Sequence, residues 1–184
     1  MFCRGNHESR GDGIRNVSAI YPTESGLPFT YIFRQGPAAF LVVDSGETGT
    51  RNSMAQCGKP FYEDYLRMQM EWVAEAVKSP EWKSAEVRIC FVHAPMRDFG
   101  VPGDFVVHGW MNRNFVPVLN EAGVNLMISA DYHEYIYTPS GEMGNDFPII
   151  VNDSHSRADV KVEGKRIAVD IYDVNGNTSH SLRF

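Results

Sequence analysis

The sequence of 184 residues has few cysteines, no run of Lys or Arg and no long apolar segment. Its three cysteines, Cys3, Cys57 and Cys90, are an odd number without the close spacing of a metal knuckle. This pattern favours buried or incidental thiols over a redox role. A net charge of −6 without a basic run argues against nucleic acid or an anionic membrane as the main partner. No stretch reaches the ~18 apolar residues of a membrane span, so we expect no transmembrane segment.

The sequence also lacks internal repeats, low-complexity segments and a visible linker. Its start does not have the basic-then-apolar pattern of a signal peptide, and no compartment follows from that. The length suits one domain with a hydrophobic core, and the hydrophobic fraction of 43% is ordinary for a globular protein. We therefore expect a single domain over residues 1–184.

Strand-like and helical patterns alternate along the first half of the chain. Residues 29–33 and 39–43 predict a hairpin, and the second run is apolar enough for burial on both faces. Apolar residues then recur at intervals of four, three and four, which predicts a helix over 61–77. Pro80 is expected to end this helix, because proline cannot continue the hydrogen-bond ladder.

Two further apolar strands each end in a candidate ligand. The strand over 87–92 ends at His93, and the strand over 125–130 is followed by Asp131 and His133. In α/β folds, binding groups gather at the carboxyl ends of the strands. A second helix is predicted around 115–122. The tail has four more strand-like runs between tight-turn signals, at 149–151, 160–162, 167–172 and 179–184.

The beginning of the chain carries a second kind of signal. In Gly5-Asn6-His7-Glu8, an Asn-His pair follows a glycine. The carbonyl oxygen of Asn6 can coordinate a cation, and the imidazole of His7 can protonate what that cation binds. A metal ligand and a proton donor are thus adjacent in the sequence.

The segments 5–8, 92–95 and 129–133 follow the order of the third, fourth and fifth motifs of the calcineurin-like metallophosphoesterases. The chain resembles the purple-acid-phosphatase-like members of this family over nearly its whole length. The resemblance implies an α/β fold, the metallophosphoesterase-type α/β/β/α sandwich. The family's first two motifs, Asp-x-His and Gly-Asp-x-x-Asp, do not precede Gly5, so the expected domain is partial, with its N-terminal portion missing. An incomplete sheet would have an open edge, which favours self-association.

The resemblance also implies roles for individual residues. Asn6 and His93 would bind one metal ion, His133 would bind a second, and His7 would protonate the leaving oxygen. The mixed nitrogen and oxygen ligands suit two divalent or trivalent ions of Fe, Mn or Zn. Such a dinuclear site would bind phosphoryl oxygens and activate a water. The implied substrate is a small-molecule phosphoester or a phosphoprotein.

One position departs from the family pattern. Asp131 stands where the Gly-His-x-His motif has its first histidine. A carboxylate still binds metal ions and favours harder ones such as Mn, Mg or Fe, so we take Asp131 as a ligand. The alternative is an incomplete second site. His108 follows the fourth motif and is the candidate substrate-binding residue, with an ordinary loop histidine as its alternative.

The function expected from these residues is that of a metal-dependent phosphatase or phosphodiesterase. As a truncated form, the chain alone is expected to have low or no activity. The alternative is a non-catalytic half-domain that acts through a binding partner. For localisation, the family resemblance implies a secreted or periplasmic protein.

Overall fold

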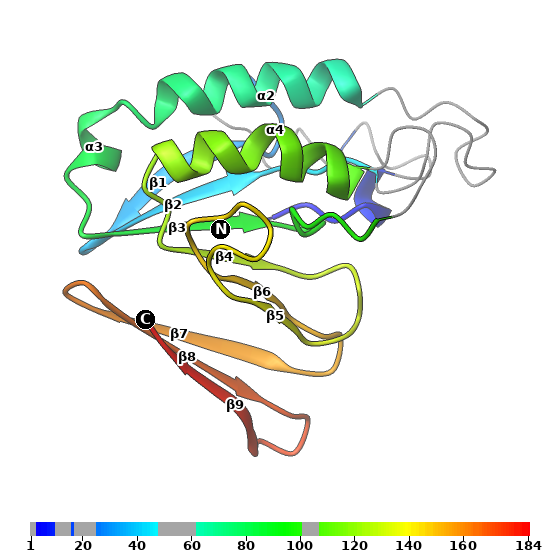
Figure 1. The fold of residues 1–184 in the computed structure, drawn as a ribbon, viewed down its shortest axis with the longest axis vertical. Helices are drawn as coiled ribbons and strands as arrows, with labels where there is room; N and C mark the ends of the chain where they lie inside the picture. Colours follow the sequence, from blue (N-terminus) through cyan, green and yellow to red (C-terminus); the bar gives the residue numbers. More distant parts are fainter. Residues whose placement is uncertain (1–2, 10–15, 17–24, 48–61, 101–106) are drawn as a thin grey trace.

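The computed structural model describes residues 3–9, 16, 25–47, 62–100 and 107–184, and Cys57 lies outside these ranges. Two β-sheets lie face to face, and helices cover the outer face of the larger sheet (Figure 1). The elements in chain order are η1 (His7–Ser9), β1 (Tyr31–Gln35), β2 (Ala38–Val43), α2 (Glu63–Ala76), α3 (Pro80–Lys83), β3 (Val87–Val92), α4 (Val107–Glu121), β4 (Leu126–Ser129), β5 (Ile136–Thr138), β6 (Ile149–Val151), β7 (Arg157–Glu163), β8 (Arg166–Tyr172) and β9 (Thr178–Arg183).

The larger sheet has six strands in the order β1-β2-β3-β4-β6-β5. Strands β2, β3, β4 and β6 run parallel, and β1 and β5 pair antiparallel at the two edges. All four residues of β4 are buried, as expected of a parallel strand covered on both faces. The carboxyl ends of the parallel strands lie at one edge of the sheet, where the candidate ligands follow.

The helical layer buries one face of this sheet. Leu66 and Val73 of α2 and Phe115 of α4 belong to this core. Trp82 of α3 is fully buried and donates its indole N–H to the carbonyl oxygen of Ala122 at 2.9 Å. Burying such large apolar side chains is the main stabilising contribution of this layer.

Both predicted helices have different bounds in the structure. The first, α2, ends at Ala76, and Pro80 opens α3 instead of ending the preceding helix. Proline fits the first turn of a helix because no hydrogen bond needs its missing N–H, and Ser79 caps this turn. The second, α4, begins at Val107, well before the predicted 115–122. The sequence did not predict this earlier start because Gly109 lies in the first turn, and glycine has a low helix propensity.

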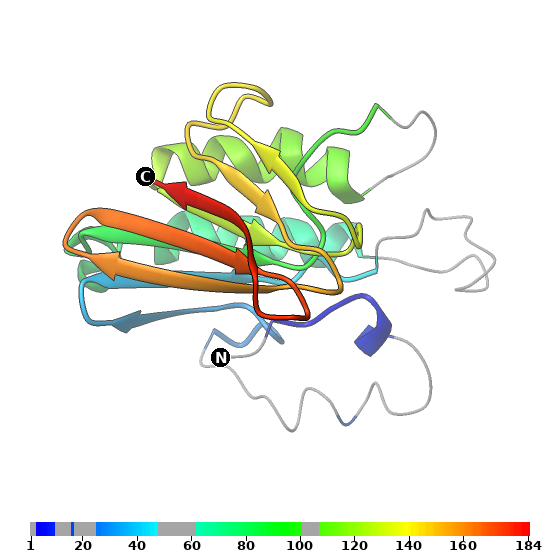
Figure 2. The same cartoon turned by 90° about the horizontal axis from the view of Figure 1, so that it is seen from below.

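The last three strands of the tail form the second sheet, β7-β8-β9, which is antiparallel, while the first tail strand, β6, belongs to the larger sheet. Ile167, Val169 and Ile171 of β8 belong to the core between the two sheets. Seen from below, the small sheet lies in front of the middle of the larger one (Figure 2). The predicted tail strands are confirmed, with β7 longer than expected. Cys90 is buried in β3, and burial raises the pKa of its thiol, in agreement with a structural role.

The layers are therefore helices, six-stranded sheet and three-stranded sheet, and the α/β sandwich is confirmed. Within the described ranges, no helix covers the outer face of the small sheet. That face carries polar pairs, such as the ion pair between Arg183 and Asp170 at 2.8 Å. No helix in the described part of the chain is long and apolar enough to cross a membrane.

Candidate functional site

Three strand ends meet at the carboxyl edge of the six-stranded sheet. Asp44 follows β2, His93 follows β3, and Asp131 lies two residues beyond β4. These strands are parallel neighbours, so the residues that follow them are close in space. The N-terminal segment reaches the same edge and brings Asn6 to it.

Oxygen atoms of two candidate ligands converge on the ring nitrogen of a third. Nε2 of His93 lies 3.2 Å from Oδ1 of Asn6 and 3.2 Å from Oδ1 of Asp131. Ligand atoms that surround one cation at 2.0–2.2 Å stand roughly 3.0–3.4 Å from one another. The spacing in this Asn6–His93–Asp131 centre therefore fits one nitrogen and two oxygen ligands of a single ion. It also fits an imidazole N–H shared between two oxygens.

The carboxylate of Asp131 is held on both sides. Its second oxygen, Oδ2, lies 3.1 Å from Nε2 of His108. Burial acts to raise the pKa of Asp131, but the hydrogen bonds from His108 and His93 and their charges outweigh it, and the pKa lies below its usual range. Asp131 is therefore ionised at neutral pH, so no proton has to leave it before a cation binds.

His108 lies in the first turn of α4, and not in a loop as predicted. It is buried, and its ring meets Phe99 and Tyr132 edge-on at 5.6 and 5.3 Å between ring centres. The rings of Phe99 and Tyr132 stack on each other at 4.0 Å. These contacts hold the imidazole beside Asp131, and a contact between His108 and the substrate stays a prediction.

Sequence reasoning missed Glu47. This residue is buried, and its Oε1 accepts a hydrogen bond of 3.5 Å from the side-chain amide of Asn6. That contact turns the carbonyl oxygen of Asn6 toward His93. The available signal was the position of Glu47 just beyond a buried strand, the same signal that identified His93 and Asp131.

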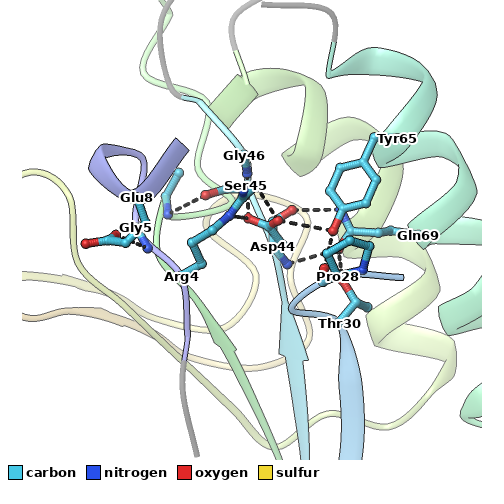
Figure 3. A network of polar contacts seen from close by, with 11 residues as sticks. Arg4, Gly5, Glu8, Pro28, Thr30, Asp44, Ser45, Gly46, Tyr65 and Gln69 are labelled. Carbon is cyan, nitrogen blue, oxygen red and sulfur yellow. Dashed lines mark hydrogen bonds and ion pairs between the residues drawn. The ribbon is translucent and has the colours of Figure 1, made fainter. Parts of the chain in front are cut away.

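A buried polar network fixes the N-terminal segment to the end of β2 (Figure 3). Arg4 forms an ion pair with Asp44 at 2.5 Å, and both side chains are buried. Asp44 also accepts hydrogen bonds from the amide of Gly46 at 2.9 Å and the hydroxyl of Tyr65 at 3.1 Å. Burial raises the pKa of Asp44, and the charge of Arg4 opposes that shift. Gln69 bonds both the N–H and the carbonyl oxygen of Asp44.

Close packing around position 5 favours glycine there. A Cβ atom there would lie 2.8 Å from Oε2 of Glu8 and 3.3 Å from the ring of His93. The same Glu8 oxygen accepts a hydrogen bond from the amide of Gly5 at 2.8 Å (Figure 3). The missing side chain thus allows the segment with Asn6 to approach His93.

Two predicted site residues are not part of this centre. His7 is exposed in η1. His133 is exposed and lines a hollow of about 400 Å³ with His155, His180 and other residues, none of which belongs to the Asn6–His93–Asp131 centre. Among the described residues, no group of three or more His, Cys, Asp or Glu side chains is arranged to hold a metal ion. The proposed centre at the sheet edge has three ligand residues only when the side-chain amide of Asn6 is counted with His93 and Asp131.

No family model and no curated protein matches the sequence. Several solved structures have a similar fold. The purple acid phosphatase PPD1 from yellow lupin seeds matches with a TM-score of 0.65 at 12% identity, over 98% of this chain and 37% of the phosphatase. GAP50, the anchor in the inner membrane complex of Plasmodium, matches at 0.53 and 14% identity, over 85% of this chain and 53% of GAP50.

PhoD matches with a TM-score of 0.51 at 12% identity, over 83% of this chain and 44% of PhoD. The chain thus spans 37–53% of the length of these three proteins. At such identities the likeness establishes the fold and nothing finer. The chain has the α/β sandwich of the metallophosphoesterase type.

Proposed function

We propose that the Asn6–His93–Asp131 centre is the metal-binding part of a phosphoester hydrolase. The meeting of one imidazole nitrogen and two oxygens at the carboxyl edge of the sheet carries this proposal. Mixed nitrogen and oxygen donors suit Mn, Fe or Zn, and the carboxylate favours the harder ions among them. A bound cation would polarise a phosphoryl oxygen of the substrate.

Each residue of the proposed site would have a distinct role. Asn6, His93 and Asp131 would hold the cation, while Glu47 and His108 would keep the Asn6 amide and the Asp131 carboxylate in orientation. His7, exposed next to Asn6, would donate a proton to the leaving oxygen. The substrate would be a small phosphoester or a phosphoprotein.

The position of His133 leads us to expect slow turnover by this chain alone. The centre gathers donors for one cation, whereas the family resemblance implies two cations with His133 as a ligand of the second. With Mn²⁺, we expect p-nitrophenyl phosphate to be hydrolysed at a trace rate that His93→Ala abolishes. A rate near the 1–10³ s⁻¹ typical of enzymes would contradict the expected low activity.

A second candidate function is a non-catalytic half-domain that acts by binding a partner. The exposed position of His133 favours it, because a binding role does not need a second cation. GAP50, the anchor in the inner membrane complex of Plasmodium, has a similar fold. In the same assay, equal rates for the wild-type chain and His93→Ala at every Mn²⁺ concentration would favour this candidate over a hydrolase.

The proposal assigns His108 to positioning Asp131, so His108→Phe is expected to weaken metal binding. The phenyl ring keeps the edge-on aromatic packing but leaves Oδ2 of Asp131 without its donor. Loss of such a supporting hydrogen bond lowers metal affinity by roughly 10–100-fold. A Mn²⁺ titration would measure the change, with His155→Phe as the matched control on the exposed hollow. Equal dissociation constants for the two variants would contradict the proposed role of His108 in positioning Asp131.

A further inference from the structure

The small sheet ends in a strand with a regular charge pattern. β7 is at one end of the order β7-β8-β9, and among the described residues no strand pairs with its other edge. The outward side chains of β7 alternate in sign along the strand and are, in order, Arg157, Asp159, Lys161 and Glu163. The side chains between them, Ala158, Val160 and Val162, pack against the core between the sheets.

The connection to β8 determines which backbone groups face the free edge. Glu163 and Arg166 lie opposite each other across a two-residue turn. The residues that flank such a turn form a hydrogen-bonded pair, and these pairs alternate along the ladder. Val162 and Val160 therefore direct their N–H and C=O groups away from β8. An edge with unpaired groups of this kind is a template for another strand.

We propose that β7 pairs antiparallel with β7 of a second copy of this chain, about a two-fold axis at Val160. In this register Val160 faces its own copy and Ala158 faces Val162, so the free backbone groups of both strands meet. On the outer face, Asp159 lies opposite Lys161 and Arg157 lies opposite Glu163. Each charge on the strand thus meets the opposite charge, and the two-fold axis repeats every pair.

The alternation of charges selects this register against its neighbours. A shift by two residues in one direction puts Asp159 opposite its own copy, and a shift in the other direction puts Lys161 opposite its own copy. A shift by one residue exchanges the buried and exposed faces of the strand. Parallel in-register pairing would place every charge opposite itself. Like charges directly opposite each other destabilise a strand pair, so the antiparallel register about Val160 is favoured.

The paired strands would join two small sheets into one continuous sheet. Arg157 already bonds Asp159 of its own strand at 2.9 Å, with both side chains largely exposed. Each exposed ion pair of this kind contributes little energy. The pairs therefore determine the register and the choice of partner more than the affinity between the two copies. The backbone hydrogen bonds along the edge would supply the attraction, as in other cases of strand addition.

Charge exchange tests the register without disturbing the core. Sedimentation equilibrium of the wild-type chain is expected to give a monomer–dimer equilibrium. Lys161→Asp places Asp159 opposite an aspartate, and Asp159→Lys places Lys161 opposite a lysine. Each variant alone is expected to dimerise at least about tenfold more weakly. An equimolar mixture is expected to recover the dimer, because the mixed pair again has opposite charges at both positions.

Recovery of the dimer on mixing would show that both variants fold, because an unfolded variant could not form the mixed dimer. The weaker dimerisation of each variant alone would then be due to like charges facing each other. Lys83→Asp, on the exposed surface of α3, is the matched control for a charge reversal and is expected to dimerise like the wild type. The proposal is overturned if the wild-type chain stays monomeric at every concentration. It is equally overturned if both single variants dimerise as strongly as the wild type, or if the mixture does not recover the dimer.

Discussion

Replacing Arg4 with methionine is expected to lower the free energy of unfolding by about 3–5 kcal/mol. The substitution leaves the fully buried carboxylate of Asp44 without its cation. Methionine keeps most of the apolar stem, so the loss reports mainly on the charge. Part of it also reflects the guanidinium lying 4.7 Å from the ring centre of Phe29. Urea denaturation, followed by circular dichroism, would measure the change as a lower midpoint at similar slope.

An exposed ion pair provides the matched control for this prediction. Arg113 contacts Asp98 at 2.9 Å, but the side chains are 62% and 40% exposed. Arg113→Met is therefore expected to cost less than about 1 kcal/mol. Adding Asp44→Asn to Arg4→Met is expected to recover part of the loss, because it removes the unpaired charge. Equal costs for Arg4→Met and Arg113→Met would show that the Arg4 pair does not hold the N-terminal segment in place.

Replacing His93 with alanine is expected to raise the dissociation constant for Mn²⁺ by more than about a hundredfold, since even supporting residues change metal affinity by 10–100-fold. His93 is the group that both Asn6 and Asp131 approach at 3.2 Å, so its loss removes the only nitrogen donor of the proposed set. Isothermal titration calorimetry with Mn²⁺ would measure the effect.

The control for His93→Ala is His155→Ala, which removes an exposed imidazole from the hollow that His133 also lines. It is expected to leave Mn²⁺ affinity unchanged. An unfolding midpoint close to that of the wild type would show that His93→Ala keeps the fold. If His155→Ala weakened binding and His93→Ala did not, the metal site would lie with His133 and not at the sheet edge.

Much of the fold could be predicted because burial leaves a direct trace in the sequence. The runs that became β2, β3 and β4 are short and largely apolar, as is typical of parallel strands that are covered on both faces. Their ends pointed to His93 and Asp131, which the structure brings together with Asn6. That these three residues bind a metal stays a prediction.

The position of His133 could not be predicted from the spacing of residues. Asp131 and His133 both have positive φ angles, 73° and 58°, so the chain turns sharply at each of them. The alternation of a strand therefore does not apply, and the two side chains lie in different surroundings. Arg4 was missed for another reason, since its partner Asp44 is 40 positions away and no local pattern links them.

The most direct test of the account is the number of Mn²⁺ ions that the wild-type chain binds. Calorimetry combined with electron paramagnetic resonance would give the stoichiometry and detect coupling between neighbouring ions. The Asn6–His93–Asp131 centre predicts one ion per chain, with no coupled pair, and binding that His93→Ala abolishes. No binding at all, or two coupled ions per chain, would contradict it.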